Sequence, residues 1–386
     1  MDPLAGLSID TFLKEYWQKK PLLIREGLSG VNGLIEPDEL AGLALEDAVE
    51  SRIMVEHSPS NWEVLRGPFQ EDTFKNLPQT HWTLLIQALD HHIPAVADIL
   101  DFFDFLPSWR VDDIMASYAP PGGSVGPHYD YYDVFLVQAQ GQRHWQIGQL
   151  CDDTTPLLDN SDVRILSNFE CCEEYTLNPG DILYLPPGVA HHGVAVDNCM
   201  TLSVGFRADT EQELLSEYCH YLEDKLDGSL RYQDPELEPQ TNSGWISEPA
   251  IDRISHILQK QVSDRDNIKQ WLGEYLSQTK YLDDPKPPQI LYTENDVQSL
   301  LNQHHPMRRD ESSRFLYTGQ AHQPSQFFVN GSALPAQESA IPLILYLCGQ
   351  RQFPSIELAQ LAKNPRELQL LAHLLNTGAL YLPDDD

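Results

Sequence analysis

Two histidines and one aspartate, His128, Asp130 and His191, have the residue types and the spacing of a metal site. Two imidazoles and one carboxylate form the facial triad that holds non-haem Fe(II) and leaves coordination positions open for oxygen and a co-substrate. Residues two apart on a β-strand project from the same face, so His128 and Asp130 are expected to reach one ion together. Ligand chemistry alone leaves zinc and manganese as alternatives, because imidazole suits several metals.

The segments around these ligands have matching designs. Residues 122–141 and 180–191 each combine framing glycines, a short apolar strand and a ligand at the end or start of a strand. In the second segment, Pro186-Pro187-Gly188 ends the strand 181–185, since proline cannot donate to the ladder. This arrangement predicts a double-stranded β-helix, a jelly-roll barrel of the cupin kind with the metal at its mouth.

His192 competes with His191 for the third ligand position. The offset of two residues from Gly188 favours His191, and on a strand the side chain of His192 would point to the opposite face. Three further histidines have no partner at ligand spacing and are interpreted as structural: His91, His92 and His144.

Arg143 begins the strand that follows the metal-bearing segment. A guanidinium is a planar fork that matches a carboxylate, so an arginine in an iron barrel is a natural anchor for the far end of a dicarboxylate. The alternative is a surface arginine in a turn. Ser117 and Ser203, on strands within 113–118 and 201–204, are candidates for additional hydroxyl hydrogen bonds to such a co-substrate.

The motifs in 12–25, 126–135, 186–191 and 203–207 resemble those of a known family. The chain is similar to the JmjC ribosomal oxygenases of the cupin-4 group, and within them to the bacterial hydroxylases of an arginine in large-subunit ribosomal protein sixteen. The resemblance covers nearly the whole chain.

This resemblance implies Fe(II) on His128, Asp130 and His191, and 2-oxoglutarate on Arg143 and Ser117. It implies that O2 and 2-oxoglutarate are consumed, giving succinate and carbon dioxide, while a substrate side chain is hydroxylated. Two alternatives stay open: the same chemistry on a histidine of another ribosomal protein, and a barrel that senses a metabolite without turnover.

The chain is strongly acidic, with 25 Lys and Arg against 58 Asp and Glu and a formal net charge of −33. Such a chain repels phosphate backbones and attracts a very basic partner such as a ribosomal protein. The alternative is that the acidity only keeps the protein soluble. Tyr131, Tyr132 and Asp133, beside the predicted metal, are candidates for receiving a cationic substrate side chain.

Six cysteines show no C-x-x-C pair, and the sequence has no signal peptide and no apolar run of about 18 residues. We therefore expect a cytoplasmic protein without a membrane-spanning helix. A reducing compartment also keeps iron in the Fe(II) state.

The predicted fold class is α+β with a mostly β catalytic core. We expect a JmjC/cupin barrel with N-terminal helical elements in 1–207, a helical dimerisation region in 208–282 and a winged-helix-like domain in 289–386. Residues 283–288 have the composition of a stiff linker between the last two.

In the helical region, a capping box at Thr210 opens one helix, and a second helical segment covers about 251–276. These helices pack on the barrel or form a homodimer interface, and the resemblance supports the homodimer. In the last domain we expect a hairpin at 327–331, three short helices and a closing strand at 377–382. These helices carry few Lys or Arg, so we expect a protein-binding or structural module that makes no direct contact with DNA.

Overall fold

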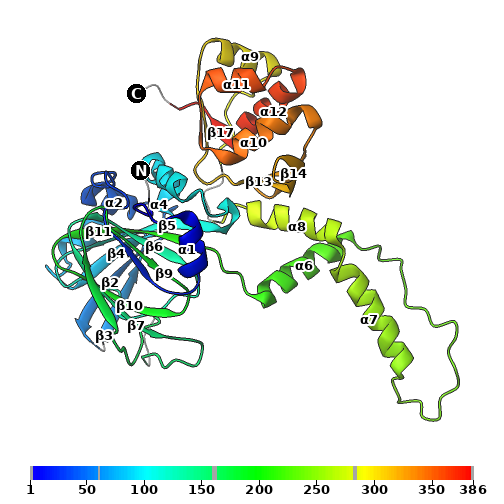
Figure 1. Ribbon diagram of the computed structural model, residues 1–386, viewed down its shortest axis with the longest axis horizontal. Helices are drawn as coiled ribbons and strands as arrows, with labels where there is room; N and C mark the ends of the chain where they lie inside the picture. Colours follow the sequence, from blue (N-terminus) through cyan, green and yellow to red (C-terminus); the bar gives the residue numbers. More distant parts are fainter. Residues whose placement is uncertain (1–2, 60, 159–162, 281–284, 384–386) are drawn as a thin grey trace.

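The computed structural model describes residues 3–59, 61–158, 163–280 and 285–383. Figure 1 shows a β-rich barrel at the lower left, three helices running out to the right, and a mixed domain above the barrel. The three predicted parts are therefore distinct in space.

The N-terminal part consists of short helices and strands that precede the barrel. They are α1 (Ile9–Glu15), β1 (Leu22–Ile24), α2 (Pro37–Leu43), β2 (Ser51–Ser58), β3 (Asn61–Arg66), α3 (Glu71–Lys75), β4 (Trp82–Ile86), α4 (Leu89–His92), α5 (Pro94–Ala97) and two 3-10 helices (Asp98–Phe103 and Ser108–Arg110). Helix α1 buries Phe12 against the barrel, where its ring meets those of Phe135 and Tyr184 at centroid distances of 5.7 and 5.1 Å. The N-terminal elements thus share one core with the barrel.

The barrel strands are β5 (Val111–Ala119), β6 (Val134–Gln140), β7 (Arg143–Leu150), β8 (Glu173–Leu177), β9 (Ile182–Leu185), β10 (Val189–Ala195) and β11 (Cys199–Phe206). Together with β1, β2, β3 and β4 they form two antiparallel sheets, an eight-stranded one in the order β1-β9-β6-β11-β5-β4-β2-β3 and a three-stranded one in the order β10-β7-β8. Strands far apart in the sequence pair within a sheet, for example β1 with β9 and β5 with β11, as in a jelly roll. The predicted barrel is confirmed.

Two glycines of the predicted frames adopt backbone conformations that suit glycine. Gly180 has φ of 93° in the turn where the Asp181 N–H donates to the Asn178 carbonyl. Gly188 has φ of 79° and its N–H donates to the Asp130 carbonyl at 2.7 Å. A left-handed φ disfavours other residues, so the glycine spacing records where the chain must turn toward the site.

The helical arm contains α6 (Glu211–Lys225), α7 (Glu248–Val262) and α8 (Arg265–Ser277). The capping box at Thr210 is present, because its hydroxyl accepts from the N–H of Glu213. The predicted single segment over 251–276 is wrong in one respect: it is two helices. The break falls at Asp264, whose carboxylate caps α8 by accepting from the N–H groups of the next helical turn.

The C-terminal domain mixes short helices with two three-stranded sheets, β16-β12-β17 and β13-β14-β15. Its elements are α9 (Glu294–Asn302), β12 (Met307–Arg309), β13 (Phe315–Gln320), β14 (Gln323–Val329), β15 (Ser332–Pro335), a 3-10 helix (Glu338–Ala340), α10 (Ile341–Gly349), β16 (Gln352–Phe353), α11 (Ser355–Leu361), α12 (Pro365–Asn376) and β17 (Leu380–Tyr381). The predicted hairpin and helices are confirmed, whereas the closing strand is shorter than 377–382. Gly378, with φ of 76°, lies in a turn before it.

Helix α8 packs on the C-terminal domain. The position of a Cβ on Gly273 would lie 2.3 Å from the ring of Phe328, so only glycine permits this approach. The N–H of Gly331 also donates to Ser277 Oγ at 3.0 Å. In the predicted linker 283–288, Asp283 and Asp284 lie outside the described residues, and 285–288 form neither helix nor strand.

None of the helices among the described residues is both long and apolar enough to cross a membrane.

Candidate metal and co-substrate site

The two histidine ligands are joined by their backbones. The His128 N–H donates to the His191 carbonyl at 3.0 Å, and the His191 N–H donates to the His128 carbonyl at 2.8 Å. His191 lies in β10, next to a bulge, but His128 and Asp130 lie in an extended segment before β6. The expectation that His128 and Asp130 share a strand is therefore wrong, because the segment that contains them pairs with β10 only through one isolated bridge at His128 and not through a continuous series of hydrogen bonds.

The ligand atoms of His128, Asp130 and His191 all lie within 4.8 Å of one another, in the one such group of three among the described residues. His191 Nε2 is 3.6 Å from Asp130 Oδ2. The Nδ1 atoms of His128 and His191 face the carbonyl oxygens of Gly126 and Val189 at 2.9 and 3.0 Å. A carbonyl only accepts, so each Nδ1 carries the proton and each Nε2 lone pair is available to a metal.

Electrostatics agree with this donor set. Burial and the neighbouring His128 lower the pKa of His191 to about 4, so its imidazole is neutral at pH 7. A neutral imidazole is the form that binds a metal. Two imidazole nitrogens and a carboxylate that line one cavity therefore fit a divalent ion such as Fe(II).

The other histidines lie away from the triad. His192 points to the opposite face of β10 and meets the ring of Phe169 at 6.1 Å between centroids. His144 lies beside Thr176 and Glu174 on the same outer sheet. His91 and His92 belong to α4. None joins the triad, as the sequence indicated.

The triad opens into a cavity of about 510 Å³, and Arg143 lies in its wall. Only 3% of Arg143 is exposed, and its Nη1 donates to Ser117 Oγ at 3.2 Å. Ser203 lines the same cavity from β11. The predicted set of Arg143, Ser117 and Ser203 therefore comes together although its members lie on three different strands.

Three buried N–H groups in this wall have no partner among the described residues: Nε and Nη2 of Arg143 and Nε1 of Trp145. An unsatisfied buried donor costs about 1–3 kcal/mol, and more when it is charged. Native proteins rarely retain such groups unless a ligand or water satisfies them. A carboxylate placed against Arg143 would satisfy its two free donors, so the wall fits the distal end of 2-oxoglutarate.

Comparison with known proteins agrees with this geometry. The family model described as "JmjC domain" matches residues 98–214, and that described as "ROXA-like winged helix" matches residues 257–381. The "Ribosomal protein uL16 3-hydroxylase" of Escherichia coli K12 is 34% identical over 378 residues, 98% of each chain. The chain belongs to the JmjC-domain ribosomal oxygenases. A "Probable ribosomal oxygenase" of Haemophilus influenzae is 33% identical over 84% of this chain and 81% of its own.

A solved structure of the Escherichia coli ribosomal oxygenase YcfD, "in complex with Cobalt and 2-oxoglutarate", superposes with a TM-score of 0.87 and 33% identity over 98% of both chains. The metal triad of this oxygenase and a relative that holds 2-oxoglutarate together support Fe(II) and 2-oxoglutarate as its metal and co-substrate.

The three candidate substrate residues of the oxygenase are placed differently. Tyr132 lines the cavity. Tyr131 is exposed, and its hydroxyl meets Tyr129 and Arg164 near the cavity mouth. The prediction for Asp133 does not agree with the structure. Its carboxylate is fully buried on the other side of the strand start and is absent from the cavity lining.

Asp133 instead fastens the N-terminal region to the barrel. Its carboxylate accepts from the Tyr184 hydroxyl at 2.6 Å and from Gln18 Nε2 at 2.9 Å, and Arg110 lies 3.5 Å away. The chain bends at Tyr131 and Tyr132 before β6 begins, and the three neighbouring side chains therefore do not share one face.

Sequence reasoning missed other residues of the cavity. Arg164 lies over the ring of Tyr131 at 4.8 Å, and Asp112 pairs with Lys280 at the rim. The doublet Asp112-Asp113 at the start of β5 was a usable signal for charge at this end of the barrel. Arg164 follows a segment without a recognisable sequence pattern, and Lys280 lies after the end of α8. The sequence therefore contains no signal that either residue reaches the cavity.

Proposed function

We propose that this chain hydroxylates an arginine side chain of the large-subunit ribosomal protein uL16, using Fe(II), 2-oxoglutarate and O2. In this proposal His128, Asp130 and His191 hold the iron, and Arg143, Ser117 and Ser203 bind the co-substrate. The observation that carries the chemistry is the buried guanidinium of Arg143 with two free donors in the wall of the triad's cavity.

When bound, Fe(II) and 2-oxoglutarate supply the oxidation of an unactivated C–H bond together with decarboxylation of the co-substrate to succinate. The residues of the chain orient these groups and exclude water. Arg143 neutralises the distal carboxylate by a bidentate pair, and the Ser117 hydroxyl fixes the guanidinium. The Gly126 and Val189 carbonyls keep both imidazoles in the tautomer that presents Nε2 to the ion.

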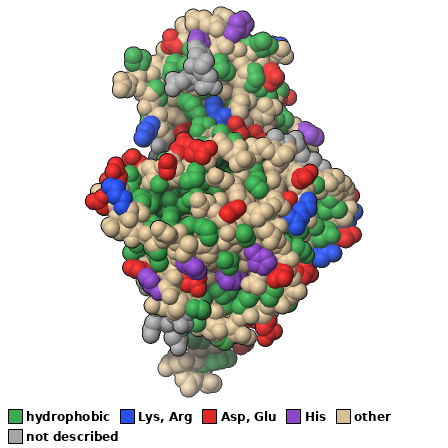
Figure 2. All heavy atoms as spheres, turned by 90° about the vertical axis from the view of Figure 1, so that its left-hand side faces the viewer, with side chains coloured by type: hydrophobic (Ala, Val, Ile, Leu, Met, Phe, Trp, Pro, Cys, Tyr) green, Lys and Arg blue, Asp and Glu red, His purple; other side chains and the backbone are tan. Residues whose placement is uncertain are grey.

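The substrate part of the proposal is supported by identity over 98% of the chain with a protein named for uL16 hydroxylation. It is also supported by charge. Acidic side chains spread over the face shown in Figure 2, in agreement with the net charge of −33, and this favours a basic partner. Tyr132, 40% exposed in the cavity wall, offers a ring on which a substrate guanidinium can stack.

We further propose a homodimer formed by the helical arm, 208–282. Helix α7 has no buried residue, and apolar side chains recur along one side of it at Ile251, Ile254, Leu258 and Val262. In Figure 1 this helix extends away from both other parts. An apolar face of this length requires a partner, and a second copy of the arm supplies one. Sedimentation of wild type and Ile254→Asp tests this, since only the wild type should sediment as a dimer.

The remaining assignments complete the proposal. Residues 1–207 form the catalytic unit, and the winged-helix module of 289–386 acts as a structural or protein-binding element that makes no direct DNA contact. The protein works in the cytoplasm, where ribosomal proteins are made.

The test is mass spectrometry of recombinant uL16 after incubation with the enzyme, Fe(II), 2-oxoglutarate and O2. We expect a gain of one oxygen on a single arginine, with succinate formed in equal amount, and no gain with Asp130→Ala. A gain on a histidine of another ribosomal protein would replace the substrate assignment. Succinate formation that no ribosomal protein stimulates would refute the proposed activity.

A further inference from the structure

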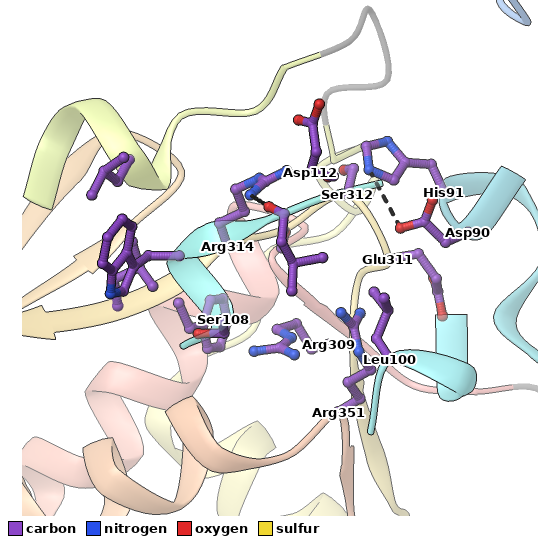
Figure 3. A pocket seen from close by; sticks show the side chains of 16 residues that line it. Asp90, His91, Leu100, Ser108, Asp112, Arg309, Glu311, Ser312, Arg314 and Arg351 are labelled. Carbon is purple, nitrogen blue, oxygen red and sulfur yellow. Dashed lines mark hydrogen bonds and ion pairs between the residues drawn. The ribbon is translucent and has the colours of Figure 1, made fainter. Parts of the chain in front are cut away.

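A second cavity lies at the junction of the barrel and the C-terminal domain, apart from the metal triad (Figure 3). Its volume is about 40 Å³, room for a small ion or a few waters. Three arginines of the C-terminal domain line it: Arg309, Arg314 and Arg351. Ser108 and Trp109 of the barrel are exposed and line it too, so a solute can enter from solvent.

Two of these guanidinium groups have donors without partners. Arg309 is 8% exposed, and its Nε makes no hydrogen bond among the described residues. Nη1 of Arg351 is also buried and unpartnered, although Nε of Arg351 lies 3.6 Å from Asp101. In Figure 3 both guanidinium groups point into the enclosed space. Burial, and then repulsion from Arg351, lower the pKa of Arg309 to about 9, and attraction from Asp101 and Glu311 only partly opposes this.

Two of the acidic groups in the lining are engaged by other cations. Glu311 accepts from Nε of Arg308 at 2.6 Å and from the Tyr381 hydroxyl at 3.1 Å. Asp112 forms an ion pair with Lys280. Among the described residues neither carboxylate forms an ion pair with Arg309, although Glu311 and Asp101 lie near enough to attract its charge.

The third acid and the third arginine have hydrogen-bond partners of their own. Asp90 accepts from the N–H of Ile114 at 2.8 Å, and burial raises its pKa to about 6. Arg314 donates to the carbonyls of Val111 and Asp112 at 2.8 and 2.6 Å. These carbonyls satisfy its hydrogen bonds but do not neutralise its charge.

We propose that the junction cavity binds a small inorganic oxyanion of the phosphate class, held by Arg309 and Arg351, and that the ion stabilises the contact between barrel and C-terminal domain. An oxyanion satisfies both free donors and removes the repulsion between the two arginines. It is a ligand of this interface and takes no part in the oxidation.

The test is a calorimetric titration of the full chain with inorganic phosphate, together with thermal melts in phosphate and in chloride of equal ionic strength. Wild type should bind phosphate and melt higher in phosphate than in chloride. Arg309→Met should bind phosphate at least about tenfold more weakly, because it loses a charge-assisted hydrogen bond. The matched control is Arg366→Met, which removes an exposed arginine of α12 and should behave as wild type.

A second readout separates a ligand site from a merely unsatisfied cluster. Without phosphate, Arg309→Met should melt at or above the melting temperature of wild type, since it removes an unpaired buried charge. Phosphate should raise the melting temperature of wild type and so remove this difference. Equal melting of wild type in phosphate and chloride overturns the proposal, as does undiminished phosphate binding by Arg309→Met. If Arg309→Met does not fold, Arg351→Gln carries the same expectations.

Discussion

Replacing Arg143 by methionine tests the co-substrate site most directly. The side chain is 3% exposed, and its Nε and Nη2 lack partners among the described residues. A bidentate carboxylate would gain two charge-assisted bonds there, each worth about 1.5–3 kcal/mol. Their loss amounts to at least about 3 kcal/mol, or about a hundredfold in 2-oxoglutarate affinity. The melting temperature without co-substrate should not fall, because the variant removes a buried charge that forms no ion pair with the described residues.

The assay is succinate formation against 2-oxoglutarate concentration, with anaerobic calorimetry to measure binding without turnover. Arg164→Met is the matched control, since Arg164 lines the other end of the same cavity. It should leave 2-oxoglutarate affinity unchanged. An Arg143→Met variant that binds 2-oxoglutarate as tightly as wild type would falsify the reasoning from unpartnered donors. An equal loss of 2-oxoglutarate affinity in both variants would mean that the net charge of the cavity determines binding, and not the paired donors of the Arg143 guanidinium.

Three further predictions concern the metal, the core and pH. His128→Ala and Asp130→Ala should abolish stoichiometric iron binding, measured by elemental analysis, with the fold retained in circular dichroism; full iron content in either would exclude that ligand. Asp133→Ala should lower the unfolding free energy by about 2–4 kcal/mol, because it leaves the Tyr184 hydroxyl and the Gln18 amide without their acceptor. It should leave the KM for the protein substrate unchanged. Burial raises the pKa of Asp90 to about 6, above about 3.9 in the unfolded chain, so its ionisation destabilises the fold as pH rises between these values. Denaturation at pH 4.5 and pH 7 should show wild type losing about 2 kcal/mol relative to Asp90→Asn, and parallel behaviour of the two would contradict this.

The ligands could be predicted from sequence because the glycines and prolines around them mark forced turns, and turn positions are local information. Arg143 could be predicted because it directly follows such a turn. Arg164 and Lys280 could not, since each reaches the cavity from a segment whose position depends on long-range packing. The break between α7 and α8 was also hidden, because Asp264 looks like an ordinary polar residue until its carboxylate caps the next helix.

The assignment of Asp133 failed for a different reason. The expectation treated three neighbouring polar residues as one patch, whereas the chain bends at Tyr131 and Tyr132 before β6 begins, so that neighbouring side chains do not share a face. Tyr132 reaches the cavity, and Asp133 therefore enters the core beside Tyr184.

The backbone bridge between His128 and His191 has a consequence for metal identity. The bridge and the two carbonyl contacts fix both imidazoles without an ion, so different divalent ions meet nearly the same rigid pocket. Such a pocket discriminates little by shape, and intrinsic affinity then ranks cobalt, nickel and copper above ferrous iron. The supply of each metal ion therefore determines which ion is bound, and an excess of a competing metal would abolish the activity while leaving the protein folded.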